Sequence, residues 1–387
     1  MRVLICGGGV IGASVAYFLS LRQVEAVVIE RVALASAASG KSGGFLARDW
    51  CDGSPLGPLA RRSFELHATL AEDPGGAWGY RRLDTLGVIA SARHGAGAFR
   101  SLKPPDWLGP DATVHARLGT TETTAQVDPA EFTKGMMAAA IDRGARLQIG
   151  YVTGITRAAD RSAADGLIVD GERLAGDAVV IAMGPWSALA SQWLPLPAVY
   201  GLKGHSLVFR NELPISPQAL FVEMEDEDGT VHTPEIFPRP DGTTYVCGLP
   251  SEAPLPADPS DVAPDSGAYE TLRAMTARLA PKLAAGELLA AQTCYRPVVR
   301  DGLPLIGRVP GVAEAYVATG HSVWGMLNGP ATGEAMAELI VDGAASTVDI
   351  APFDPARFGP RAARTADPWA NRPPQSGRNN DPSDQSG

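Results

Sequence analysis

The 387-residue sequence contains no apolar run approaching 18 residues, which argues against a membrane span. Its net charge of −10 argues against nucleic-acid binding, because phosphate recognition needs clustered cationic charge. Only five of its 33 basic residues are lysines, so a lysine beside a motif is informative. The four cysteines, at positions 6, 51, 247 and 294, have neither metal-ligand spacing nor disulfide density. We therefore expect no metal site.

The remaining composition is ordinary for a globular enzyme, with 45% hydrophobic and 20% charged residues. An apolar strand begins at Arg2, which leaves no room for a signal peptide. These features predict a cytoplasmic enzyme that acts on small molecules.

A glycine-rich loop lies between this apolar strand and a helix with small residues on one face. Gly7, Gly9 and Gly12 form GxGxxG, which permits a tight turn and lets the backbone approach a pyrophosphate at the helix N-terminus. Glu30 ends a second apolar strand, where its carboxylate can accept hydrogen bonds from a ribose. This order of elements predicts a dinucleotide site, and the neighbouring residues assigned to it are Val10, Ile11 and Arg31.

A second small-residue loop, SGKSGG (39–44), follows. Its backbone N–H groups and the Lys41 ammonium can bind phosphate, whereas the alternative is a flexible surface loop. The residues assigned to binding are Ser39, Lys41, Ser42, Gly43 and Gly44. GxGxxG occurs once, so no second nucleotide domain is present to deliver electrons from a pyridine nucleotide.

Apolar βαβ patterns at both ends of the chain flank a block of short strands between Tyr200 and about Ala290. They predict an α/β fold in which a Rossmann-like nucleotide domain is interrupted by a mostly antiparallel β-sheet substrate domain of α+β type. The nucleotide domain comprises residues 1–80, 125–198 and 292–350, and the substrate domain residues 81–124 and 199–291. Residues 359–387 are rich in Pro, Arg, Ser and Asn and predict a disordered tail.

Over roughly residues 2–343 the chain resembles the D-amino-acid oxidase-like (DAO) family of flavoproteins, which includes glycine oxidase and monomeric sarcosine oxidase. The segments that carry the resemblance are GGGVIGASVAYFL, ASGKSGG, VDPAEF, VVIAMGPWS, YRPVVRDGLPLIG and ATGHSVWGMLNGPATG. Within the family the chain is most similar to a poorly characterised branch of oxidoreductases. The resemblance implies FAD bound across the Rossmann-like domain, with the isoalloxazine ring facing a cavity under the antiparallel sheet.

By position, the resemblance implies further contacts with the cofactor. The residues concerned are Val152, Ala182, Gly184, Trp186, Gly320, His321, Trp324, Gly325 and Met326. Backbone amides after Gly320 would stabilise negative charge on the flavin ring. His321 and Trp324 can alternatively be core residues.

The resemblance also implies a substrate site around Arg296, which matches the arginine that holds the substrate carboxylate in glycine oxidase. Its planar guanidinium suits bidentate binding, and the structural alternative is a salt bridge with Asp301. A second cationic contact of that enzyme is absent, because Val323 occupies its place. By position, Glu235 falls near an active-site tyrosine of glycine oxidase. Its carboxylate can attract a cationic amine, and the alternative is a surface carboxylate on a strand. Arg48 can reach the flavin's active face or lie on the surface, and Trp324 is the fourth catalytic candidate.

Cys294 raises the question of covalent attachment. In monomeric sarcosine oxidase a cysteine at this position is bonded to the flavin's 8α-methyl group, whereas glycine oxidase has glycine there and binds FAD without a bond. Attachment needs a thiolate, and apolar surroundings raise the pKa of a thiol. We expect non-covalent FAD, with Cys294 packed beside the dimethylbenzene edge.

These features predict an FAD-dependent oxidoreductase that oxidises an amine or an amino acid resembling glycine, sarcosine or a D-amino acid. Hydride transfer to flavin N5 would give an imine, and oxygen or another acceptor would take the electrons. The alternatives are a hydroxy-acid dehydrogenase and a low-turnover flavoprotein that serves as a scaffold or assembly factor.

Overall fold

The computed structural model describes residues 1–359 except 74–75, 77, 92–102, 161 and 212–214. Its first sheet has six strands in the order β19-β20-β12-β1-β2-β8. Five of them run parallel, and β19 pairs antiparallel with β20 at one edge. The strands are β1 (Arg2–Cys6), β2 (Glu25–Glu30), β8 (Arg146–Ile149), β12 (Ala178–Ile181), β19 (Leu305–Arg308) and β20 (Ala315–Thr319).

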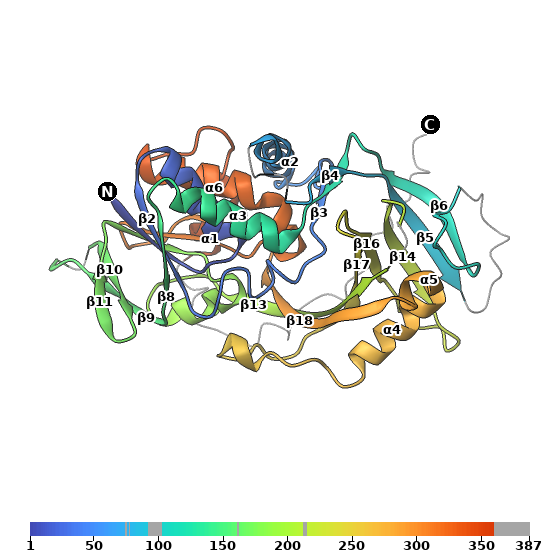
Figure 1. Ribbon diagram of the computed structural model, residues 1–387. Coiled ribbons are helices and arrows are strands. Elements are labelled where there is room, and N and C mark those ends of the chain that lie inside the picture. The colour runs from blue at the N-terminus through green and yellow to red at the C-terminus, as the bar shows by residue number, and fades with distance from the viewer. Residues whose placement is uncertain (74–75, 77, 92–102, 161, 212–214, 360–387) are drawn as a thin grey trace, which may run out of the picture.

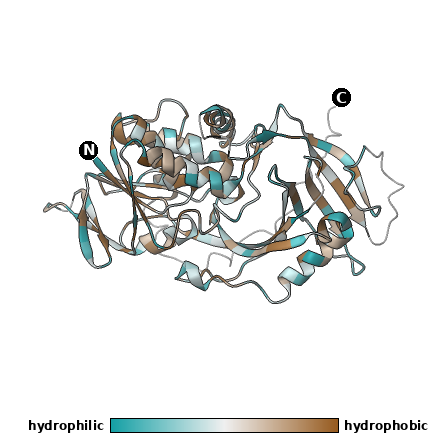
Figure 2. Cartoon of the chain, in the orientation of Figure 1, coloured by the Kyte–Doolittle hydropathy of each residue, from teal (hydrophilic) through white to brown (hydrophobic). Residues whose placement is uncertain are grey.

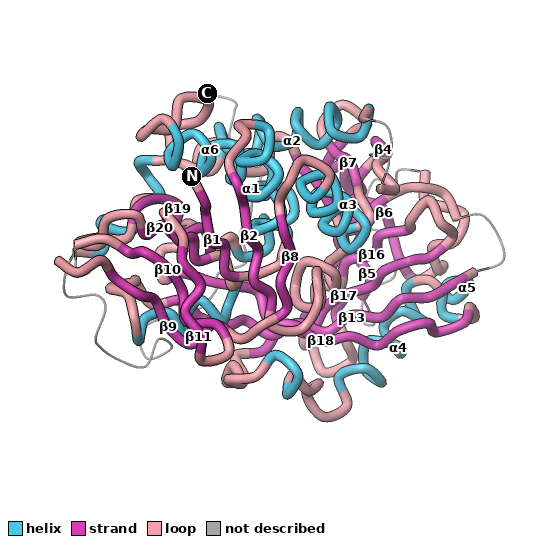
Figure 3. The backbone as a smooth tube through the Cα atoms, turned by 60° about the vertical axis from the view of Figure 1, so that its left-hand side comes forward, coloured by secondary structure: helices cyan, strands magenta, loops and turns pink. Residues whose placement is uncertain are grey.

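Both faces of this sheet are covered, which explains why its strands read as continuous apolar runs. Val3 and Ile5 of β1 belong to a core formed with the helices, whereas Leu4 and Cys6 point to the opposite core. The helices are α1 (Val10–Leu21), α2 (Gly57–Glu72), α3 (Pro129–Ile141) and α6 (Gly325–Val341). A small antiparallel sheet covers the other face and consists of β9 (Val152–Arg157), β10 (Ala164–Val169) and β11 (Glu172–Ala175) (Figure 3).

The second sheet has eight strands, with the order β18-β13-β17-β16-β14-β5-β6 and β15 paired to β14. All neighbouring strands are antiparallel except β14 and β5. The strands are β5 (Thr85–Ser91), β6 (Ala112–Gly119), β13 (Val199–Arg210), β14 (Ala219–Glu225), β15 (Val231–His232), β16 (Glu235–Pro238), β17 (Thr243–Ser251) and β18 (Glu287–Val299). Helices α4 (Ala268–Leu279) and α5 (Pro281–Ala284) pack against its outer face (Figure 1).

Short elements complete the chain. A three-stranded sheet, β3 (Phe45–Ala47), β7 (Thr124–Gln126) and β4 (Arg81–Arg82), lies between the two larger parts. The 3-10 helices are η2 (Gly184–Gln192), η3 (Pro259–Asp261), η4 (Ser322–Trp324), η5 (Ala351–Phe353) and η6 (Pro355–Phe358). In the colouring of Figure 2, apolar residues are concentrated on the central strands and the helices beside them.

The predicted α/β fold, with a Rossmann-like part and a mostly antiparallel second sheet, is confirmed. Two of the longer elements border the two parts: β13 begins at Val199, and α6 begins at Gly325. Within the described ranges, no helix has both the length and the apolar character needed to cross a bilayer. The predicted tail, apart from Gly359, lies outside the described residues, and the domain boundaries stay a prediction.

Candidate functional site

A cavity of about 450 Å³ lies between the glycine loop, the 39–44 loop, the start of α6 and the inner face of the second sheet. Most of the predicted cofactor and substrate residues line it. These are Gly7, Gly9, Val10, Ile11, Glu30, Arg31, Ser39, Lys41, Ser42, Gly43, Gly44, Val152, Ala182, Gly184, Trp186, Glu235, Cys294, Arg296, His321, Trp324, Gly325 and Met326. Gly12, Arg48 and Gly320 do not line it. No group of three or more His, Cys, Asp or Glu side chains among the described residues could hold a metal ion.

The turn between β1 and α1 requires glycine at two positions. Gly7 has a φ of +110°, and a Cβ there would lie 2.4 Å from the Ala182 carbonyl oxygen. A Cβ on Gly12 would lie 2.0 Å from the Gly7 carbonyl oxygen. Gly12 therefore permits the tight packing beneath the turn, while Gly7 and Gly9 border the cavity.

Side chains already hold this turn in place. One oxygen of Glu30 accepts a hydrogen bond from Gly8 N at 2.7 Å and the other from Val32 N at 2.9 Å. Each oxygen retains a lone pair for a further donor such as a ribose hydroxyl. Ser39 Oγ accepts from Val10 N at 2.9 Å, which satisfies one of the first amides of α1.

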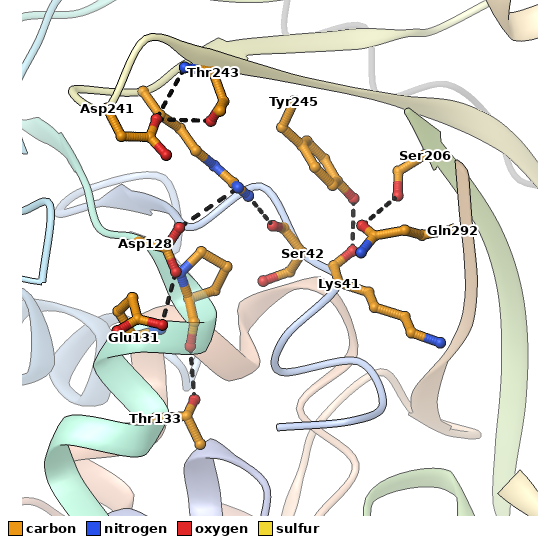
Figure 4. A network of polar contacts seen from close by, with 12 residues as sticks. Lys41, Ser42, Asp128, Glu131, Thr133, Ser206, Asp241, Thr243, Tyr245 and Gln292 are labelled. Carbon is orange, nitrogen blue, oxygen red and sulfur yellow. Dashed lines mark hydrogen bonds and ion pairs between the residues drawn. The ribbon is translucent and has the colours of Figure 1, made fainter. Parts of the chain in front are cut away.

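The 39–44 loop is hydrogen-bonded to the second sheet at three points, unlike a flexible surface loop. Tyr245 Oη donates to the Lys41 carbonyl oxygen at 2.9 Å (Figure 4). Arg239 donates to the Ser42 carbonyl oxygen at 3.1 Å. Lys41 Nζ donates to the Thr293 carbonyl oxygen at 3.3 Å. The loop thus connects the dinucleotide turn to the inner face of the sheet.

His321 lies at the start of α6 and is buried. Burial lowers its pKa to about 3, so the imidazole is neutral. Its Nε2 shares a hydrogen bond with Thr332 Oγ1 at 3.0 Å, whereas Nδ1 has no partner in the described part of the chain. Ser42 Oγ is another buried cavity atom without a partner there. Two such atoms fit a polar ligand in this cavity.

Gly320 and Trp324 lie in the turn that precedes α6, and their roles there differ. Gly320 has a φ of +82°, and a Cβ there would lie 2.4 Å from Val299 Cγ2, so glycine is needed for the turn itself. Trp324 is half-buried at the cavity, and its ring lies edge-on to that of Trp50 at a centroid distance of 6.5 Å.

Residues 252–267 connect β17 to α4, and Arg31 and Trp186 contact this segment. Trp186 Nε1 donates to the Pro256 carbonyl oxygen at 2.9 Å. Arg31 forms an ion pair with Asp258, and its guanidinium lies 4.1 Å from the centroid of the Tyr151 ring. Pro259 of the same segment lines the cavity.

Arg296 extends across the inner face of the second sheet. A Cβ on Gly204, in the neighbouring strand, would lie 3.5 Å from Arg296 Nη2, which is an ordinary van der Waals contact, so the guanidinium lies against this strand. The suggested salt bridge with Asp301 is wrong, because Asp301 pairs with Arg357 at 2.8 Å. No carboxylate of the described residues lies within 4.0 Å of the guanidinium nitrogens of Arg296.

Glu235 faces the same cavity and is not a surface carboxylate. Burial raises its pKa, although the nearby Arg296 charge and a hydrogen bond from the Cys247 thiol, at 3.4 Å, oppose this effect. The cavity therefore contains a cationic and an acidic side chain that do not neutralise each other through a direct ion pair.

Cys294 lies beside Arg296 at the cavity, and burial raises the pKa of its thiol despite the charges of Arg296 and Lys41. Its surroundings therefore favour the thiol over the reactive thiolate. Arg48 lies outside the cavity lining and near Asp52. The pKa of Asp52 is lowered mainly by its hydrogen bond with Arg61 and further by the charge of Arg48.

Several cavity residues were missed by the sequence analysis. These are chiefly Phe45, Trp50, Gly204, Phe221, Phe237, Tyr245 and Cys247. The period of two in a strand gives a signal for some of them, since Phe237 follows Glu235 on the same face and Cys247 follows Tyr245. Phe45 begins the three-residue strand β3 and Trp50 lies in the turn after it, so neither carries such a signal.

Known proteins are similar to this chain in both sequence and fold. The model of the family described as FAD dependent oxidoreductase (DAO) matches residues 2–339. The sequence is 30% identical to "Putative oxidoreductase C1F5.03c" of Schizosaccharomyces pombe, an alignment that covers 92% of this chain and 97% of that protein. It is 28% identical to glycine oxidase of Geobacillus kaustophilus, with coverages of 91% and 95%. The crystal structure of glycine oxidase from that organism matches with a TM-score of 0.73 at 26% identity, covering 92% of this chain and 99% of the other.

Proposed function

Because this chain belongs to the DAO family of FAD dependent oxidoreductases, we propose that it oxidises an amine or amino acid whose carboxylate binds Arg296. The observation that carries this proposal is the pair formed by Arg296 and Glu235 in one cavity, without a direct ion pair between them. A guanidinium and a carboxyl group arranged in this way suit the two polar groups of an α-amino acid.

The cavity fits FAD at the end formed by the glycine turn, Glu30 and the 39–44 loop. Glycine at positions 7 and 9 leaves backbone beside the cavity for a pyrophosphate, and Glu30 retains lone pairs for a ribose. When bound, FAD supplies the oxidising ring that accepts a hydride from the substrate's α-carbon.

The chain's own residues orient the substrate. Arg296 holds the carboxylate, and Glu235 in its ionised form accepts a hydrogen bond or a proton from the amine, a role that its raised pKa supports. The inner face of the second sheet keeps water from the reacting carbon. Loss of a hydride from the α-carbon of the neutral amine leaves a protonated imine, which water hydrolyses, and oxygen or another acceptor takes up the two electrons.

FAD is held without a covalent bond, because burial keeps Cys294 in its thiol form. We therefore expect acid precipitation of the purified protein to release all yellow colour into the supernatant. A flavin-bearing peptide that contains Cys294 would contradict this prediction.

An anaerobic screen tests the proposed function. Amino acids, secondary amines and hydroxy acids are mixed with the protein, and bleaching of the flavin absorbance is followed. Bleaching by an amino acid or amine, with ammonia release and peroxide formation in air, supports the proposal. Bleaching by hydroxy acids alone indicates a hydroxy-acid dehydrogenase, and no bleaching by any compound indicates a scaffold.

A further inference from the structure

Four aromatic side chains at the cavity form a continuous surface, which we call the aromatic wall: Phe45, Trp50, Phe221 and Phe237. Their ring centroids lie 4.8 to 5.6 Å apart in five contacts. Phe237 is buried, while Phe45, Trp50 and Phe221 are half-buried. The wall is thus a packed unit that lines the cavity.

The aromatic wall continues directly from Glu235. Phe221 is the cross-strand neighbour of Glu235, and Phe237 follows Glu235 by two residues on the same face of β16. Cys247 is the neighbour of Glu235 on the other side, toward Arg296. Along this face the order is therefore Arg296, which can bind a carboxylate, then Glu235, which can bind an amine, and then the apolar aromatic wall.

From this order we infer that the substrate is an α-amino acid with an aromatic or bulky aliphatic side chain, which packs on the aromatic wall. The inference rests on the proposed function for Arg296 and Glu235. Glycine or sarcosine would leave the wall uncovered and gain nothing from it. A side chain the size of a phenyl group gains roughly 10- to 100-fold in affinity by burial on such a surface.

The packing of the rings distinguishes the aromatic wall from an aromatic cage that would bind a quaternary ammonium group. An aromatic cage holds its rings apart around the cation. In the wall the rings contact one another, and Phe45 and Phe237 are stacked with an interplanar angle of 18°. A surface of this kind accepts an apolar group against it.

Binding of unreactive carboxylates tests the wall without turnover. Acetate and phenylacetate are titrated into the FAD-loaded protein, and the dissociation constant is taken from the perturbation of the flavin spectrum. We expect phenylacetate to bind at least about tenfold more tightly than acetate. In Phe221→Ala the difference should shrink to within about threefold. Phe221→Leu, which retains more of the side-chain volume, serves if Phe221→Ala does not fold.

Phe358→Ala is the matched control, because Phe358 is also half-buried but packs beside Arg357 outside the cavity lining. It should keep the preference for phenylacetate. Equal affinity for the two carboxylates in the unaltered protein would overturn the inference. So would loss of FAD from both Phe221 variants, which would make the wall a support for the cofactor.

Anaerobic flavin reduction by glycine and by both enantiomers of phenylalanine separates the two proposals. Faster reduction by an enantiomer of phenylalanine than by glycine supports the inference. Faster reduction by glycine overturns it while amine oxidation stands. Tight phenylacetate binding without reduction by glycine or by either enantiomer of phenylalanine overturns the inferred amino-acid substrate, although the wall would still bind an apolar group.

Discussion

At the scale of single residues, Arg296 is the side chain whose geometry bears most directly on substrate binding. Arg296→Lys keeps the charge but loses the planar pair of donors, so we expect KM for an accepted amino acid to rise by roughly tenfold or more. FAD content should stay normal. Steady-state kinetics checks this, with Arg357→Lys as control, because Arg357 pairs with Asp301 outside the cavity lining. Unchanged KM on every substrate would assign Arg296 a structural role.

At the scale of elements, the contact between α1 and α6 joins the glycine turn to the residues around His321. A Cβ on Gly333 of α6 would lie 2.5 Å from the Ser14 carbonyl carbon in α1. Gly333→Val must therefore push the helices apart, and we expect a loss of about 1–3 kcal/mol in unfolding free energy, with reduced FAD content.

Chemical denaturation and the flavin-to-protein absorbance ratio measure these two effects. The control is Ala138→Val, which adds the same side chain to an exposed position of α3 and should cost no more than about 0.5 kcal/mol. Equal stability of the two variants would show that α1 and α6 tolerate a wider separation.

At the scale of the whole molecule, two buried histidines make stability depend on pH. Burial lowers the pKa of His67 to about 4 and that of His321 to about 3, from 6.5. The unfolded chain thus binds more protons than the folded one below pH 6.5. We expect stability to fall on acidification from pH 6.5 to 5, by up to about 1.4 kcal/mol per pH unit for each histidine.

Urea denaturation at several pH values in this range measures the slope. His67→Gln keeps a donor for the Met326 carbonyl oxygen and should remove the contribution of one histidine. A slope that is the same in both proteins would assign the acid sensitivity to other groups.

The sequence was most informative where neighbours in the chain are also neighbours in space. The turn from Gly7 to Gly12, the Glu30 carboxylate and the apolar strands follow from local pattern, and the family's order of segments located Arg296. The aromatic wall could not be predicted, because pairing of β14, β16 and β17 brings Phe221 and Phe237 together. Asp301 illustrates the converse: it is near Arg296 in sequence, but a later segment supplies its partner, Arg357.

The 252–267 segment has a kinetic consequence. Its ion pair with Arg31 and its hydrogen bond from Trp186 close it against the dinucleotide end of the cavity. Both contacts must break before this segment can move away from that end of the cavity. We expect these two contacts to slow the release of a cofactor bound at that end.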